Sequence, residues 1–379
     1  MPAYDAFLLV SFGGPEGPGE VMPFLENVTR GRGIPPERLA SVAEHYYAVG
    51  GVSPINQQCR DLLAAVRADF SGSGLSLPVY WGNRNWTPYL TDTVRAMADD
   101  GVRRAVALVT SAFSSYSSCR QYLDDIERAR AAVGPDAPGI DKIRRFFNHP
   151  GFIEPFAESA RAALATLPAG LRDDAHLVFT AHSVPVAMAE ASGPGGGHRY
   201  VAELTEAARL IAERVEGGTH PHTLAYQSRS GPPSQPWLEP DVCDHLGDLA
   251  KSGTQAVVVI PVGFVSDHME VRHDLDVEAA QSADSLGLAF ARAATPGSHA
   301  GFAAMVTELV RERLALPDEA GPDSPVLDSP VLDNPMPGDA GSPAALGGMG
   351  VPRQACPADC CRYAAPAGRP RGGEGSSPA

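Results

Sequence analysis

Short apolar runs alternate along most of this chain with stretches of helical periodicity. Several of the runs are almost entirely apolar, as expected for strands that are covered on both faces. Helical stretches such as RDLLAAVRADF and VAELTEAARLIAERV lie between them. The alternation predicts an α/β fold with parallel sheets. The predicted strands are Tyr4–Phe12, Pro78–Asn83, Arg103–Ser111, His176–Ser183, His222–Ser228 and Gln255–Val265.

The predicted elements form two similar halves, and a long helix within Phe147–Leu167 leads from the first into the second. Globular patterning ends near Leu316, and a short tandem repeat, DSPVL-DSPVL, then indicates a flexible, proline-stiffened linker. The expected organisation is a first half at 1–150, a second half at 151–300, a helix near 300–316 that completes the first half, a linker at 317–352, a cysteine segment at 353–363 and a disordered tail at 364–379.

Composition narrows the classes of function. The net charge of −15 argues against general binding of nucleic acids, because phosphate would be repelled. No apolar run approaches the roughly 20 residues that span a bilayer. The first residues carry no basic lead and read as a strand rather than a signal sequence. We therefore expect a cytoplasmic protein without a membrane span.

Chemistry in an open α/β sheet is expected outside the carboxyl ends of the strands. The first strand ends in SFGGPEG, which lacks the GxGxxG spacing of a dinucleotide loop, so a nicotinamide site is rejected. Gly13 and Gly14 instead permit close approach of the backbone to a ligand. His182 lies at the carboxyl end of the fourth predicted strand, where it can face a cleft. For one histidine alone, a hydrogen bond to the turn explains the position equally well.

The last predicted strand is followed by SDHMEVRHDLD, a dense group of titratable residues. Glu270 and Asp274 would share one helix face at this spacing. Capping by Ser266 or Asp267 explains part of the pattern, but not His268 and Glu270 after so apolar a strand. A histidine from one strand end and a glutamate from another can together hold a divalent metal and accept protons.

Two other strand ends are rich in aromatic and hydroxyl groups, YQSRSGPPSQPWLEP and TSAFSSYSSCRQY. Both suit the walls of a pocket for a planar ligand, and Tyr116 is the wall residue predicted from the second. Ordinary packing explains each aromatic residue equally well.

The chain has six cysteines, and a disulfide framework is not expected in a reducing cytosol. Three of them, Cys356, Cys360 and Cys361, lie within six residues, and clustered thiols in the cytosol indicate metal or redox chemistry. A zinc site and incidental thiols remain alternatives. Cys59 and Cys243 lie within helical patterns and read as small core residues.

Several motifs in order make the chain resemble the ferrochelatases, which insert Fe²⁺ into a porphyrin. The motifs are LLVSFGGPEG, YAVGGVSPIN, TAHSVP, YQSRSG with PWLEP, and GFVSDHMEVRHDLD. The resemblance covers about Tyr4 to Leu316. It implies two Rossmann-like halves with parallel four-stranded sheets around a porphyrin cleft.

The resemblance also implies roles for the titratable residues. His182 matches the histidine that binds metal and abstracts protons, and Glu270 the carboxylate that faces it across the macrocycle. His268 is the neighbouring histidine of the motif. Asp274 falls where the family has an acidic residue that leads protons or metal away.

Other matches concern the porphyrin. Ser53, Arg30 and Arg32 fall near positions that hold propionates in similar enzymes, and Phe12 falls where some relatives have tyrosine on the opposite porphyrin face. The region 15–36 is polar and carries no hydrophobic lip. It resembles that of soluble bacterial enzymes acting on coproporphyrin III, so we expect coprohaem as the product. Protoporphyrin IX, another metal such as Co²⁺, and a non-catalytic haem carrier or iron–sulfur sensor are the alternatives.

Some ferrochelatases hold a [2Fe–2S] cluster with C-terminal cysteines and one internal cysteine. Such a cluster takes four thiolates. The resemblance implies Cys356, Cys360 and Cys361 as three ligands and Cys119 as the internal one, although the adjacent pair departs from the animal spacing. The partners are then a porphyrin and ferrous iron. We expect a monomer that makes transient contacts with neighbouring enzymes of haem biosynthesis.

Overall fold

The computed structural model describes residues 4–31, 33–231, 234–316 and 343–363. It contains two parallel four-stranded sheets, which confirms the predicted fold class. Their strand orders are the same, β2-β1-β3-β4 in the first half and β6-β5-β7-β8 in the second. The strands are β1 (Ala6–Ser11), β2 (Val79–Asn83), β3 (Arg104–Val109), β4 (Gly139–Lys142), β5 (His176–His182), β6 (His222–Gln227), β7 (Ala256–Ile260) and β8 (Ala289–Arg292).

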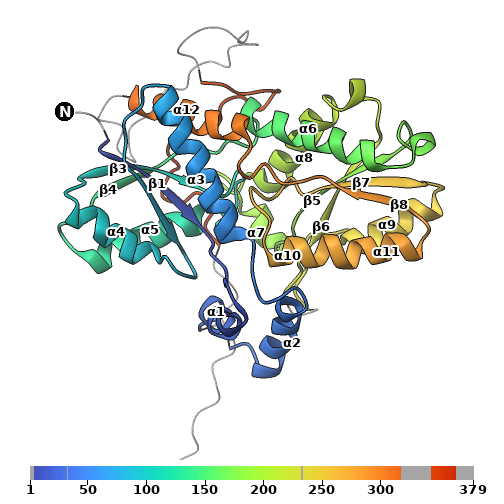
Figure 1. Ribbon diagram of the computed structural model, residues 1–379, viewed down its shortest axis with the longest axis horizontal. Coiled ribbons are helices and arrows are strands. Elements are labelled where there is room, and N and C mark those ends of the chain that lie inside the picture. Colours follow the sequence, from blue (N-terminus) through green and yellow to red (C-terminus); the bar gives the residue numbers. More distant parts are fainter. Residues whose placement is uncertain (1–3, 32, 232–233, 317–342, 364–379) are drawn as a thin grey trace, which may run out of the picture.

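Helices cover both faces of each sheet, and the two halves lie side by side (Figure 1). In the first half, α3 and α12 cover one face and α4 and α5 the other. In the second half, α6 and α8 cover one face and α9 and α11 the other. The helices are α1 (Val21–Val28), α2 (Pro36–Tyr47), α3 (Ile55–Gly72), α4 (Leu90–Asp99), α5 (Gln121–Val133), α6 (Pro150–Thr166), α7 (Val186–Glu190), α8 (Arg199–Ala212), α9 (Val242–Lys251), α10 (Met269–Val271), α11 (Ala280–Ser285) and α12 (Ala300–Leu314).

The last helix of each half packs on the other half. Helix α6 follows β4 but packs against α8 and β7, whereas α12 follows β8 and packs against α3. Both begin in the same way, because the Nδ1 atoms of His149 and His299 accept hydrogen bonds from the backbone N–H groups of Gly151 and Gly301. This exchange joins the halves through one continuous apolar core.

The strand predicted over Gln255–Val265 is shorter in the structure. β7 ends at Ile260, because Pro261 has no N–H group to continue the ladder. The next residues turn, and the Gly263 N–H donates to the carbonyl of Thr180 in β5. β4 and β8 were not among the predicted strands. Each has only four residues, and most of these are half-buried.

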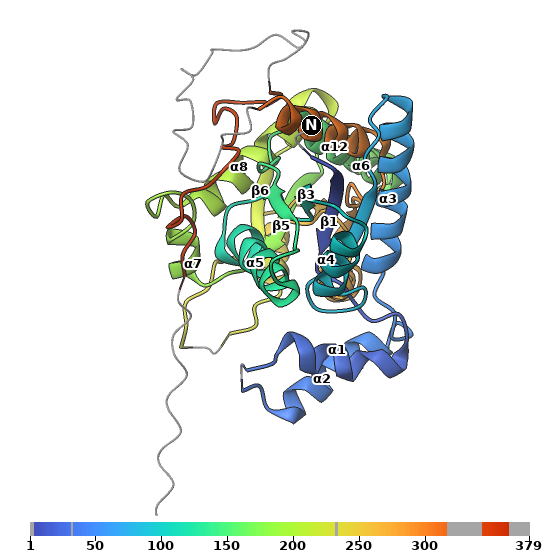
Figure 2. The ribbon, with the colours of Figure 1, turned by 90° about the vertical axis from the view of Figure 1, so that its left-hand side faces the viewer.

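Helices α1 and α2 form a hairpin beside the carboxyl end of β1 (Figures 1 and 2). Its apolar core contains Phe24, Leu25 and Ala43, and the rings of Phe12 and Trp86 pack against it. No helix in the described ranges is long and apolar enough to cross a bilayer. The aromatic contacts of Phe12 and Trp86 anchor the hairpin to the first half.

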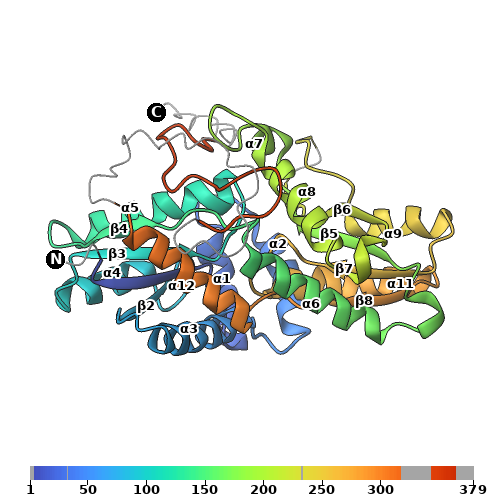
Figure 3. The same ribbon diagram turned by 90° about the horizontal axis from the view of Figure 1, so that it is seen from above.

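The C-terminal segment 343–363 lies against the body and passes from the first half toward α7 (Figure 3). Asn148 binds the backbone carbonyls of Leu346 and Gly350, and Leu346 and Met349 pack on the shared core. The structure differs here from the flexible linker expected up to residue 352, because these two apolar side chains are partly buried against the core. The predicted regions 317–342 and 364–379 lie outside the described residues.

Candidate functional site

His182 and Glu270 lie together at the carboxyl edge of the second sheet. His182 is the last residue of β5, and Glu270 lies in the short helix α10 that follows the neighbouring strand β7. The Nε2 atom of His182 is 3.6 Å from a carboxylate oxygen of Glu270. The side chains are 34% and 53% exposed, so both are accessible to a ligand.

The imidazole of His182 is oriented by its other nitrogen. Nδ1 lies within hydrogen-bond distance of the carbonyl oxygen of Ser183. A carbonyl can only accept, so the neutral ring carries its proton on Nδ1 and leaves the lone pair of Nε2 free. The hydroxyl of Tyr200 donates to the backbone carbonyl of His182 at 2.9 Å and holds the strand end in place. The free nitrogen therefore faces Glu270.

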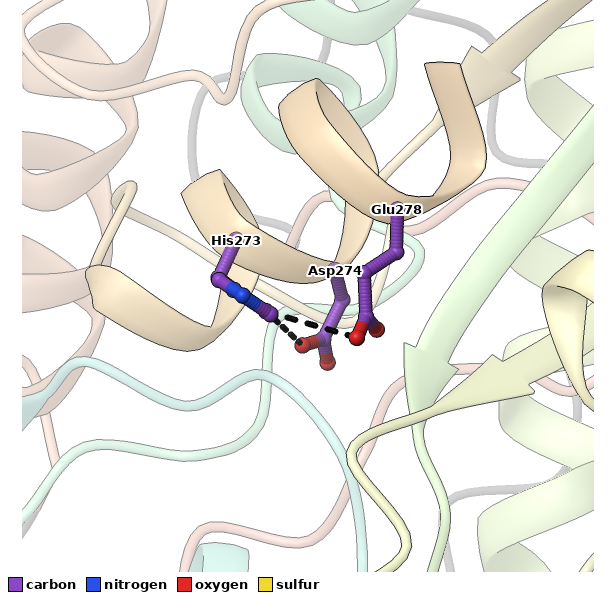
Figure 4. A group of neighbouring side chains, drawn as sticks. All are labelled: His273, Asp274 and Glu278. Carbon is purple, nitrogen blue, oxygen red and sulfur yellow. Dashed lines mark ion pairs between the residues drawn. The ribbon is translucent and has the colours of Figure 1, made fainter. Parts of the chain in front are cut away.

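A row of acidic side chains continues from Glu270 along the π-helix Arg272–Ala279. Asp274 and Glu278 each lie near His273, whose Nδ1 atom is 3.7 Å from Asp274 and 3.8 Å from Glu278 (Figure 4). The ligand atoms of these three residues lie within 4.8 Å of one another, close enough to hold one metal ion. Oxygen and imidazole ligands suit a divalent transition metal. Glu278 was not among the residues predicted from the sequence.

Asp274 is the most deeply buried carboxylate of this row. Burial raises its pKa to about 6, and the charges of Glu270 and Glu278 act in the same direction. The hydroxyl of Ser228 and the amide of Gln227 both donate to Asp274, and the hydrogen bond from Ser228 opposes the rise in pKa. A carboxylate with this pKa can accept and release a proton near neutral pH.

Arg292 in β8 fixes the segment that carries these groups. Its guanidinium pairs with Asp267 at 3.0 Å and with Asp276 in the π-helix. The backbone N–H of Asp267 donates to the side chain of Gln58 in α3, at 2.8 Å. The segment after β7 is thus tied both to its own sheet and to the first half.

His268 lies beside the pair but is largely enclosed. Its ring makes an edge contact with Phe264, with centroids 5.1 Å apart. Burial lowers its pKa below the ordinary value, so the imidazole is neutral at neutral pH. His268 therefore adds a neutral imidazole, and no positive charge, next to His182 and Glu270.

The residues predicted for the porphyrin in the first half lie after β1 and in the hairpin. Phe12 packs edge-on against Phe24, with ring centroids 6.4 Å apart. Ser53 is buried, and a Cβ on Gly14 would lie 2.7 Å from the Ser53 Cβ, so Gly14 admits Ser53 rather than a ligand. Arg30 is exposed and its guanidinium donates to the Asn27 side chain at 2.9 Å. Arg32 lies outside the described residues.

Helix α2 brings two further residues to the second half. The ring of His45 stacks on that of His273, with centroids 3.8 Å apart and planes within 5°. Tyr46 is the next residue, and burial, together with the nearby charge of Glu270, raises its pKa. Neither residue was predicted, although Tyr46 directly precedes the YAVGGVSPIN motif.

Tyr116 lies beside the C-terminal segment. Its ring packs against Tyr363 of the C-terminal segment, with centroids 6.4 Å apart. The two rings line a surface cavity of about 300 Å³ together with Arg120, Asp124 and Arg362. Its predicted place in a substrate wall stays a prediction.

The four predicted cluster cysteines form a chain of neighbouring thiols. The Sγ atoms of Cys360 and Cys361 are 3.7 Å apart, and the thiols of Cys119 and Cys360 both lie within hydrogen-bond distance of Cys356. Cys361 has a φ of +56°, a left-handed conformation that is uncommon for a residue other than glycine. Three of the four thiols are buried, and Cys356 is half-buried. Cys59 and Cys243 lie elsewhere, in α3 and α9.

Two N–H donors face these sulfurs from the body. The backbone N–H of Gly193 donates to Cys361 at 3.1 Å, and the Arg145 guanidinium donates to Cys356 at 3.7 Å. Hydrogen bonds from the thiols of Cys119 and Cys360 lower the pKa of Cys356. Four converging thiols with N–H donors fit an iron–sulfur cluster, whose sulfurs accept such bonds.

The family model and the curated relatives point to the same family. The ferrochelatase family model matches residues 4–314. A coproporphyrin III ferrochelatase of Streptomyces coelicolor is 52% identical over 99% of this chain and 97% of its own, and one of Nocardia farcinica is 59% identical over 82% and 89%. Among solved structures, SirB from Bacillus subtilis with Fe³⁺ is 12% identical over 82% of this chain and 95% of its own, with a TM-score of 0.48. The chain belongs to the ferrochelatase family.

Proposed function

We propose that this protein inserts Fe²⁺ into coproporphyrin III and releases coprohaem. The observation that carries the proposal is the accessible pair of His182 and Glu270 at the carboxyl edge of the second sheet. Relatives that cover nearly the whole chain bear the name coproporphyrin III ferrochelatase, which supports this substrate. The polar region 15–36 also supports a substrate with four carboxylates.

Insertion requires that two pyrrole N–H protons leave as the metal enters. The free Nε2 of His182 is placed to accept them, since the ring proton lies on Nδ1, beside the carbonyl of Ser183. Glu270, 3.6 Å away, takes the proton from the imidazolium. Asp274, whose pKa is raised to about 6, can pass it on to Glu278, which is exposed. The acidic row thus connects the base to solvent.

The same row offers a path for ferrous iron in the opposite direction. His273, Asp274 and Glu278 can bind the ion at the protein surface, and His182 with Glu270 can receive it at the porphyrin. Each proton that leaves along the row carries one positive charge out of the site. The exchange of an incoming dication for two outgoing protons keeps the net charge of the site constant.

The remaining predicted residues would hold the porphyrin. Phe12 would contact the face opposite His182, Ser53 with Arg30 and Arg32 would bind propionates, and Tyr116 would line a wall. A flat porphyrin does not direct its lone pairs at an approaching ion, so the ring must bend. Binding energy from the propionates can supply that strain.

The C-terminal cysteines would hold a [2Fe–2S] cluster, with Cys119, Cys356, Cys360 and Cys361 as ligands. When bound, the cluster supplies one-electron redox chemistry and a covalent link between the C-terminal segment and the body. The four adjacent thiols and the two N–H donors support this assignment. The protein would act in the cytoplasm as a monomer, in transient contact with neighbouring enzymes of haem biosynthesis.

The test is an insertion assay with purified protein under anaerobic conditions. Fe²⁺ and either coproporphyrin III or protoporphyrin IX are mixed with the protein, and loss of the free porphyrin spectrum is followed. The proposal expects rapid, protein-dependent conversion. Conversion of protoporphyrin IX alone would support the alternative substrate, and binding without conversion would support a haem carrier.

A further inference from the structure

A buried ion pair lies directly behind the cysteine group. Arg145 follows β4, and its side chain is 5% exposed; Glu203 in α8 is fully buried. The Nε atom of Arg145 is 3.4 Å from a carboxylate oxygen of Glu203, while its Nη1 atom donates to the sulfur of Cys356. One guanidinium therefore connects a buried carboxylate to a cluster cysteine.

Both partners are held in place from the other side. The carboxylate of Glu203 accepts hydrogen bonds from the backbone N–H and the hydroxyl of Ser114, at 2.7 and 2.8 Å. Arg199, one turn earlier in α8, lies 3.6 Å from the same carboxylate. The Nε atoms of Arg145 and Arg199 make no hydrogen bond among the described residues. The pair is thus fixed in position, although not all of its N–H donors have hydrogen-bond partners.

Burying two charges costs several kcal/mol per ion, and a pair with incomplete hydrogen bonds does not recover that cost by itself. A contribution to fold stability is therefore a weak explanation for this buried ion pair. A negatively charged group bound next to Arg145 explains the buried cation better. Four thiolates around two ferric ions and two sulfides carry a net charge of −2, and the described cation in contact with them is Arg145.

We infer that Arg145 and Glu203 set the reduction potential of the cluster and help to retain it. The inference rests on the proposed [2Fe–2S] site. On reduction, the cluster takes one electron from a one-electron donor, and its charge becomes more negative by one without a change in any bond. A buried cation stabilises the reduced state and a buried anion destabilises it, because low dielectric leaves both charges poorly screened.

The two residues have opposite expected effects. Arg145→Gln removes the positive charge and shifts the midpoint potential to a more negative value. Glu203→Gln keeps the shape, removes the negative charge and shifts it to a more positive value. The double variant has a potential between the two. Because the two effects differ in sign, general loosening of the structure cannot produce both.

Lys142 provides the matched control. It is half-buried in β4, near Cys119 and Cys356, and its amine binds a backbone carbonyl rather than a sulfur. Lys142→Gln removes the same charge as Arg145→Gln. We expect a smaller negative shift that declines at high salt, since salt screens a half-buried charge more than a buried one.

The experiment is an anaerobic redox titration of the full-length protein with dithionite, followed by visible spectroscopy, with iron and sulfide measured for each variant. Opposite shifts for Arg145→Gln and Glu203→Gln support the inference, and unchanged potentials or shifts of the same sign overturn it. If Glu203→Gln does not fold, Arg145→Lys provides the test. This variant keeps the positive charge and should keep the wild-type potential. Cluster loss in both Arg145 variants would show that the shape of the side chain matters and that its charge does not. Wild-type protein without iron and sulfide would refute the cluster itself.

Discussion

The Nε2 atom of His182 lies 3.6 Å from the carboxylate of Glu270, although 87 residues separate them in the chain. Their strands β5 and β7 are neighbours, so the carboxyl ends meet at one edge of the sheet. Nδ1 of His182 faces a carbonyl, which leaves Nε2 as the basic nitrogen. The pair combines a base that is free to accept a proton with a carboxylate that can take it onward.

His182→Ala should abolish insertion and leave porphyrin binding largely intact. Loss of a positioned general base typically costs about 10²–10⁴-fold in rate, and loss of the metal contact adds to this. Turnover and porphyrin fluorescence titrations measure the two effects separately. His176→Ala, at the opposite end of the same strand, is the control and should retain activity. Near-normal turnover of His182→Ala would remove the assigned role.

Glu270→Gln should slow turnover more than Asp274→Asn. The amide at 270 cannot take the proton from His182, whereas Asp274 lies further along the row. Steady-state rates of the two variants, compared at the same pH, test this order. A larger loss in Asp274→Asn would reverse the proposed sequence of proton transfer.

Ser228→Ala should move the acid limb of the pH–rate profile to higher pH. Asp274 accepts protons only when ionised, so turnover falls as the pH drops through its pKa of about 6. The Ser228 hydroxyl stabilises the ionised form, and its removal raises the pKa further. Ser228→Thr retains a hydroxyl and should leave the limb in place. An acid limb that Ser228→Ala does not move would disconnect it from Asp274.

Arg30→Ala should raise KM for coproporphyrin III more than it lowers kcat, which is the mark of lost uniform binding. The side chain is exposed, so the penalty should shrink at high salt. Arg38→Ala, on the neighbouring helix α2, is the control for loss of one positive charge. Equal KM values in all three proteins would exclude Arg30 from propionate binding.

Loss of the cluster should expose the residues around the cysteines to trypsin first. Residues 317–352 contain no lysine or arginine, so cleavage in the C-terminal segment is expected at Arg353 and Arg362. Cys119→Ser should lose colour and be cut there, while Cys59→Ser should keep its colour and resist. The part near Leu346 should stay bound, because Asn148 and the apolar core hold it without the metal. Colour that survives in Cys119→Ser would refute that ligand.

The sequence predicted the sheets because most strands are apolar runs. It also placed His182 and Glu270 at one sheet edge, because residues after adjacent parallel strands meet there. The expectation that Glu270 faces His182 across the macrocycle is wrong, because the 3.6 Å between the two side chains leaves no room for a porphyrin. β4 and β8 were not predicted, because each has only four residues, mostly half-buried, and these do not form an apolar run. The stack of His45 on His273 depends on how the hairpin meets the second half, which no local pattern encodes.

The C-terminal segment shows the same limit. PAALGGMG reads as a linker, since Leu346 and Met349 are isolated apolar residues among glycine and alanine. Their burial follows from the position of Asn148 nearly 200 residues earlier. Likewise, no local pattern could predict that the ring of Tyr116 contacts that of Tyr363, which is distant in sequence.

The central claim is insertion of Fe²⁺ into coproporphyrin III, and its most direct test is a comparison of two porphyrins. The purified protein is incubated anaerobically with Fe²⁺ and either coproporphyrin III or protoporphyrin IX, and kcat/KM is obtained from the visible spectra. The account predicts a clearly higher kcat/KM for coproporphyrin III, with no conversion by His182→Ala. Equal or faster conversion of protoporphyrin IX, or no conversion of either porphyrin, would contradict it.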